Sequence, residues 1–116
     1  MKANDLRIRN TVLFEGLAYT IFPHDISFLS ENPHHEFYKP LPLDEKWLLR
    51  FGFENKILSS EFSITNFPFI IYNNEIWTDR DNDDDAICRV DFVHELQNFY
   101  FAVKKKELEI SADALQ

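Results

Sequence analysis

The chain has 116 residues, of which 45% are hydrophobic and 16% aromatic, and its formal net charge is −8. This length suits one domain, and the apolar content is sufficient for a hydrophobic core without disulfides, since Cys88 is the single cysteine. The acidic balance disfavours direct binding to nucleic-acid phosphates, and no apolar run approaches the roughly 18 residues that span a bilayer. The first residues lack the apolar segment of a secretory signal, so we expect a cytoplasmic protein without a membrane association.

The first third of the sequence predicts short strands. Residues 11–14 and 17–22 alternate around Glu15-Gly16 and predict a hairpin, which Pro23 would end. Residues 25–29 are interpreted as a further strand, and residues 31–35 have the composition of a loop.

The middle of the chain predicts a short helix and a second hairpin. Asp44 can cap a helix over residues 44–51, and Gly52 can take the left-handed conformation that follows a helix. Strands are predicted over residues 57–64, 68–72 and 75–77, with Asn73-Asn74 as a tight turn.

The last third predicts a strand and a long helix. Residues 86–90 have strand composition, and Asp91 is placed to cap a helix over about residues 92–103. The spacing of apolar residues predicts a buried stripe of Val93, Leu96, Phe99, Tyr100 and Val103. Lys104 to Lys106 suit the end of this helix, and residues 107–110 alternate like a short strand.

These elements predict an α+β fold for one small domain over residues 1–110. The domain would contain a curved, mainly antiparallel sheet and two helices, at about residues 44–51 and 92–103. Residues 111–116 are interpreted as a loose C-terminal tail.

An acidic run is the strongest candidate in the sequence for a functional site. The segment from Glu75 to Glu95 contains eight acidic residues and two arginines. Such a run solvates a loop, binds a cation or contacts a basic partner. We interpret it, together with the preceding aromatic residue, as a partner-binding site that consists of Glu75, Trp77, Asp79, Asp81, Asp83, Asp84 and Asp85.

A calcium loop is the alternative for the same run, because Asp79, Asp81 and Asp83 have the spacing of its first three ligands. The pattern then fails, since the required glycine falls at Asp84 and the bidentate glutamate falls at Val90. No metal or other cofactor is therefore expected.

Other chemically active residues favour structural interpretations. His34-His35-Glu36, with His24 ten residues earlier, has the residue types of a zinc site or a general-base cluster. We interpret it instead as an exposed loop, because adjacent side chains on an extended chain point to opposite faces. Cys88 is expected to be a small buried hydrophobe, and no nucleophile is placed to form a triad with His94. We therefore expect a protein that is not an enzyme.

Three blocks of sequence resemble a known group of proteins: residues 1–10, 40–53 and 93–102. Their content, order and spacing resemble a widespread family of small, mostly uncharacterised proteins of phage, prophage and related bacterial genomes. The chain departs from that pattern at Arg9, where a glycine is usual, and at Lys104-Lys105, where Thr-Gly is usual. The resemblance implies a shared scaffold and supplies no catalytic residues.

A narrower resemblance is to phage-encoded anti-CRISPR proteins, including an inhibitor of a type VI-B RNA-guided RNA nuclease. It implies a non-enzymatic inhibitor that contacts a basic surface of a host nuclease and interferes with the handling of guide or target RNA. The alternative is an accessory scaffold, or a self-associating protein, with no nuclease target.

Overall fold

The structure, a computed structural model, describes residues 1, 3–55, 60–78 and 86–110. The chain divides into two compact units. Unit 1 comprises residues 1–42 and 92–107, and unit 2 comprises residues 43–91 together with the residues from 108 onward. The predicted tail, residues 111–116, lies outside the described residues.

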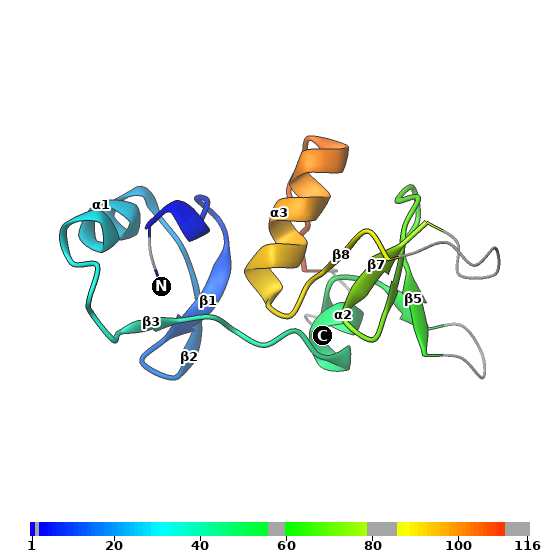
Figure 1. Ribbon diagram of the computed structural model, residues 1–116, viewed down its shortest axis with the longest axis horizontal. Coiled ribbons are helices and arrows are strands. Elements are labelled where there is room, and N and C mark those ends of the chain that lie inside the picture. Colours follow the sequence, from blue (N-terminus) through cyan, green and yellow to red (C-terminus); the bar gives the residue numbers. More distant parts are fainter. Residues whose placement is uncertain (2, 56–59, 79–85, 111–116) are drawn as a thin grey trace. The chain divides into compact units, whose positions relative to one another are not determined.

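Unit 1 contains a small antiparallel sheet with the strand order β2-β1-β3 (Figure 1). Its elements are η1 (Ala3–Asp5), β1 (Thr11–Phe14), β2 (Leu17–Thr20), α1 (Pro23–Glu31), β3 (Tyr38–Lys39) and α3 (Val93–Lys104). The predicted first hairpin is confirmed, and Glu15 and Gly16 both take positive φ, as a two-residue turn between twisted strands requires. Leu29 of α1 packs with Val12 and Tyr38 of the sheet in one buried apolar cluster.

The strand expected over residues 25–29 is wrong, because this segment belongs to α1. Pro23 is the first residue of the helix, where its missing N–H costs nothing, rather than the end of a strand. The Asp25 carboxylate accepts a hydrogen bond from the Phe22 N–H at 2.8 Å and so fixes the first turn.

Helix α3 begins one residue later than predicted. Phe92 is its N-cap, and the Glu95 side chain accepts from the Phe92 N–H at 3.1 Å, whereas Asp91 pairs with Arg89 instead. Within the predicted stripe Val93, Leu96 and Tyr100 are buried, Phe99 is half-buried and Val103 is exposed. The polar side chains of His94 and Gln97 are buried as well.

Polar side chains attach α3 to the start of the chain within unit 1. Gln97 accepts a hydrogen bond from the Thr11 N–H at 2.7 Å and donates to the Thr11 hydroxyl at 3.2 Å. Asn98 accepts from Asn10 at 2.8 Å and from the Arg7 Nε at 3.1 Å. These contacts join segments that lie more than eighty residues apart in the sequence.

Unit 2 contains an antiparallel sheet with the strand order β4-β5-β6-β7-β8. Its elements are α2 (Glu45–Arg50), β4 (Glu54–Asn55), β5 (Glu61–Ser63), β6 (Ile70–Tyr72), β7 (Glu75–Trp77) and β8 (Cys88–Arg89). Asp44 caps α2 as predicted, because its carboxylate accepts from the Trp47 N–H at 3.0 Å. The Asn73-Asn74 turn is also confirmed, since both residues take positive φ.

The α+β class is confirmed, with differences of detail. The described strands form two sheets instead of one, and α1 adds a helix to the two that were predicted. Residues 107–110, which the structure describes, form no strand, and only Leu108 among them is buried. Of the strand expected over residues 57–64, residues 57–59 lie outside the described part and β5 occupies residues 61–63.

Arg9 and Lys105 are among the residues of the described chain that take positive φ without being glycine. Arg9 has φ 78° and Lys105, the C-cap of α3, has φ 60°. At both positions the resembling family usually has glycine. The turn and the helix end are therefore formed without glycine, at the steric cost of a side chain in the left-handed region.

Candidate functional site

Strand β7 carries the two described residues of the predicted partner-binding set. Glu75 and Trp77 flank the buried Ile76, so both lie on the other face of the sheet, where they are half-buried. The remaining residues of the set, Asp79, Asp81, Asp83, Asp84 and Asp85, lie outside the described residues, and so does the calcium-loop alternative.

The face that carries Glu75 and Trp77 extends across the neighbouring strands. Glu75 lies opposite Tyr72 of β6, and Tyr72 lies opposite Glu61 of β5. Cross-strand partners share a face of a sheet, and by the same register Glu54 of β4 lies on it too. We call this surface the acidic face; it comprises Glu54, Glu61, Tyr72, Glu75 and Trp77.

Arg89 of β8 is the cross-strand partner of Glu75 on the opposite side from Tyr72. Its Nη2 lies 2.8 Å from a carboxylate oxygen of Asp91. The hydrogen bond to Asp91 and the charge of Asp91 raise the pKa of Arg89, and Glu75 adds a smaller effect. Since Asp91 already balances this cation, the negative charge of the acidic face is largely retained.

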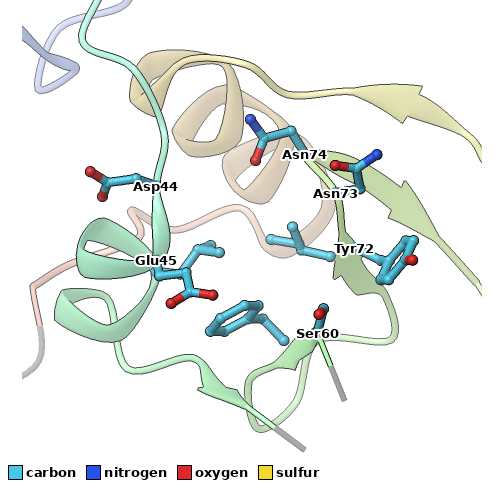
Figure 2. A pocket seen from close by; sticks show the side chains of 9 residues that line it. Asp44, Glu45, Ser60, Tyr72, Asn73 and Asn74 are labelled. Carbon is cyan, nitrogen blue, oxygen red and sulfur yellow. The ribbon is translucent and has the colours of Figure 1, made fainter.

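A cavity of about 390 Å³ lies between α2 and one end of the same sheet (Figure 2). Its apolar residues are Leu48, Phe62 and Ile71. Its polar residues are Asp44, Glu45, Ser60, Tyr72, Asn73 and Asn74. The floor residues Phe62 and Ile71 alternate with Glu61 and Tyr72, so the floor lies on the face of the sheet opposite to the acidic face. Tyr72 lines the cavity as well as the acidic face and joins the two surfaces at one end of the sheet.

The backbone positions the polar rim of this cavity. Asp44 is fixed as the cap of α2, and Glu45 occupies the first turn of that helix. The left-handed turn at Asn73 and Asn74 places their amides on the other side of the opening, as Figure 2 shows. An apolar floor with the Glu45 carboxylate at its rim suits the aliphatic stem and the cationic head of a lysine or arginine side chain.

The histidines of unit 1 do not gather into a metal site in the described chain. His34 is exposed as expected, and His35 is half-buried and accepts a hydrogen bond from the Phe37 N–H at 3.1 Å. His24 lies on α1 with its Nε2 3.4 Å from Asp25. Among the described residues no group of three or more His, Cys, Asp or Glu side chains is arranged to hold a metal ion.

Cys88 is exposed, whereas His94 is buried. Cys88 is exposed, so the expectation that it is buried is wrong; it lies on the two-residue strand at the edge of the sheet, which leaves one side open. His94 is only 7% exposed, and its Nδ1 has no hydrogen-bond partner within the described residues. Burial lowers the pKa of His94, whereas Glu95 and Asp5 raise it by smaller amounts.

Sequence reasoning missed Asp25, the buried carboxylate of the described chain. The hydroxyls of Tyr19 and Tyr38 donate to it at 2.9 Å and 2.5 Å, in addition to the Phe22 N–H. The signal that could have found it is Pro23 two residues earlier, because Pro at the first and Asp at the third position are typical of a helix start.

Comparisons with protein-family models, with curated proteins and with solved structures found no match to this chain. Within the described residues, no helix is both long and apolar enough to cross a membrane.

Proposed function

We propose that the chain is a non-enzymatic binding protein of a phage or another mobile element that inhibits a host type VI-B RNA-guided RNA nuclease. It would act in the bacterial cytoplasm and by direct protein contact. The class of nuclease rests on the sequence resemblance. The mode of contact rests on two features of one sheet, namely the acidic face and the apolar-floored cavity with Glu45 at its rim.

The acidic face supports a contact with a basic surface. A nuclease that holds guide and target RNA needs cationic grooves along the phosphate backbone. Carboxylates such as Glu54, Glu61 and Glu75 on one sheet face would steer the chain towards such a groove. Binding there would interfere with the handling of guide or target RNA.

The aromatic residues and the cavity support affinity in addition to steering. Tyr72 and Trp77 are half-buried on the acidic face, and partly exposed aromatic residues are frequent energetic anchors of interfaces. The cavity would accept a lysine or arginine of the partner, whose stem would contact Leu48 while its head would approach Glu45.

The test is a pull-down of purified chain with the nuclease, in the presence and in the absence of guide RNA, together with a target-RNA cleavage assay. We expect binding in at least one state and loss of cleavage at matching concentrations. Absence of binding in both states would refute the proposal.

A self-associating scaffold is the second candidate, and exposed apolar side chains of unit 1 favour it. Leu17, Phe22 and Phe37 are 74%, 51% and 49% exposed. The rings of Tyr19 and Phe14 connect Phe22 with Phe37, and Leu17 lies opposite Phe14. Contiguous exposed apolar side chains are typical of contact surfaces. Light scattering after size exclusion separates the candidates, because the scaffold predicts a mass above that of the 13.8 kDa monomer.

A further inference from the structure

A second cavity, of about 340 Å³, lies entirely within unit 1 and is mainly aromatic. Its lining consists of Phe14, Glu15, Tyr19, His24, Asp25, Phe28, Phe37 and Tyr38. We propose that this cavity, here called the aromatic pocket, binds an alkylated ammonium cation, such as a choline-like molecule or a methylated lysine side chain. The inference is independent of the nuclease proposal, which concerns unit 2.

The charge of the pocket favours a cation. Asp25 is 2% exposed. Burial alone raises the pKa of Asp25, but hydrogen bonds from Tyr38, the Phe22 N–H and Tyr19, with the nearby His24, outweigh burial and hold the pKa below its ordinary value. The pocket therefore contains a buried carboxylate that stays ionised.

Within the described residues, the basic group at ion-pair distance from Asp25 is His24, whose side chain is 75% exposed. Its imidazole is a cation only when it is protonated. Glu15, which also lines the pocket, adds a second carboxylate. Two carboxylates at one pocket favour a cation over a neutral or an anionic group.

The rings form a continuous wall. Phe14 lies with its centroid 4.9 Å from that of Tyr38 and 5.3 Å from that of Tyr19. Phe28 lies 6.0 Å from Tyr38 and 6.2 Å from Phe37. Aromatic faces carry negative electrostatic potential, and clusters of such faces are the known recognition device for quaternary ammonium groups.

The tyrosine hydroxyls strengthen this potential. Both hydroxyls donate to Asp25, and the Tyr38 bond is short, as expected for a hydrogen bond to a charged acceptor. A phenol that donates to a carboxylate gains electron density in its ring. The faces of Tyr19 and Tyr38 are therefore better cation acceptors than those of free tyrosines.

The hydrogen bonds also decide which kind of cation fits. Asp25 already accepts from two hydroxyls and one backbone N–H, so few of its lone pairs remain free. A guanidinium group has five N–H donors and a primary ammonium group has three, and those donors that face the rings instead of Glu15 would have no acceptor. An ammonium group whose hydrogens are replaced by methyl groups has no such requirement.

The test is an NMR titration of the full chain, observed through backbone amide signals. Choline is compared with 3,3-dimethylbutan-1-ol, which has the same shape without the charge, and a trimethyllysine peptide is compared with its unmethylated form. We expect saturable shifts at amides of residues 14–38 with choline or the methylated peptide, and none with either control. A response to the peptide alone would assign the cation to a protein side chain, and a response to choline to a free molecule.

Two variants locate the site. Phe37→Leu removes a ring that is 49% exposed, so the fold is expected to be retained, and it should weaken binding roughly two- to thirtyfold. Leu17→Ala, in the same sheet but outside the pocket lining, is the matched control and should leave binding unchanged. Equal binding of the uncharged alcohol or of the unmethylated peptide, or absence of saturable shifts with every probe, would overturn the inference.

Discussion

The two units differ in what they bury. The four buried polar or charged residues of the described chain, Asn10, Asp25, His94 and Gln97, all belong to unit 1. The buried residues that the structure describes in unit 2, among them Trp47, Phe53 and Ile76, are hydrophobic. Unit 1 is thus held by specific hydrogen bonds as well as by apolar contact, whereas unit 2 relies on apolar packing and carries its charge on the surface.

The difference follows from the course of the chain. Unit 1 combines residues 1–42 with residues 92–107, and its buried amides bridge that gap through Thr11 and Asn10. Arg7 adds an ion pair with Glu107 and a contact with the Phe101 ring at 4.2 Å. Buried hydrogen bonds select one arrangement of distant segments, because any other arrangement leaves polar groups unsatisfied.

The largest expected effect distinguishes two carboxylates that both accept a backbone N–H at a helix start. Asp25→Ala also removes the acceptor of two tyrosine hydroxyls, those of the half-buried Tyr19 and the buried Tyr38, and we expect a loss of about 3 kcal/mol in the free energy of unfolding. Asp44→Ala removes an exposed cap in unit 2 and should cost about 1 kcal/mol. Urea denaturation of both variants measures the difference.

Equal losses for Asp25→Ala and Asp44→Ala would contradict the distinction between the units. Asp25→Asn is a further check, because it retains the shape and removes the charge. Its stability should fall between that of the wild type and that of Asp25→Ala.

A smaller effect is expected for the attachment of α3 to β1. Gln97→Leu leaves the part-buried Thr11 N–H without its acceptor and should lower the free energy of unfolding by about 2 kcal/mol, again measured by urea denaturation. Thr11→Val removes only the hydroxyl and should cost about 1 kcal/mol. If Gln97→Leu were neutral, the polar link would not stabilise unit 1.

The pH dependence of stability gives a further test of the buried polar groups. Because burial lowers the pKa of His94 in the folded chain, folding disfavours its protonated form. The contribution of neutral His94 to the free energy of unfolding is complete above pH 6.5, the ordinary pKa of histidine, and is lost as the pH falls below 6.5. The pKa of Asp25 is lowered from 3.8, so the stability that ionised Asp25 contributes is lost only at pH values below 3.8.

Thermal denaturation across this pH range measures the effect, and His94→Gln is the variant to compare. The fall in stability just below pH 6.5 should be smaller in His94→Gln than in the wild type. An unchanged profile would show that another group causes the fall.

The smallest expected effect is a gain. Lys105→Gly places glycine where φ is 60°, and the free energy of unfolding should rise by about 1 kcal/mol. Lys104→Gly, in the last turn of α3, is the matched control and should lose about 1 kcal/mol. A loss in both variants would contradict the steric account of the helix end.

Local signals predicted much of the fold. The Asp44 cap, the Asn73-Asn74 turn and the Glu15-Gly16 turn act within a few residues, so their effect is readable in sequence. The apolar spacing of α3 located that helix, although Gln97 and not Val103 proved to be buried.

Long-range interactions account for the errors. A proline such as Pro23 is compatible with the end of a strand and with the first turn of a helix, and here it begins α1. The sequence alone does not show that Asp25 finds Tyr19 and Tyr38 as partners. Likewise, Glu107 pairs with Arg7, one hundred residues away, instead of joining a strand. The aromatic pocket was missed because its rings come from four separate segments of the first 38 residues.

The most direct test of the proposed contact is the affinity of the nuclease for two double charge reversals, measured by isothermal titration at physiological salt. Glu54→Lys with Glu75→Lys alters the acidic face of unit 2, and Glu31→Lys with Glu36→Lys makes the same charge change at exposed positions of unit 1. We predict that the first pair raises the dissociation constant at least about tenfold, whereas the second pair raises it at most about threefold. Equal weakening by both pairs, or no weakening by the first, would contradict binding through the acidic face.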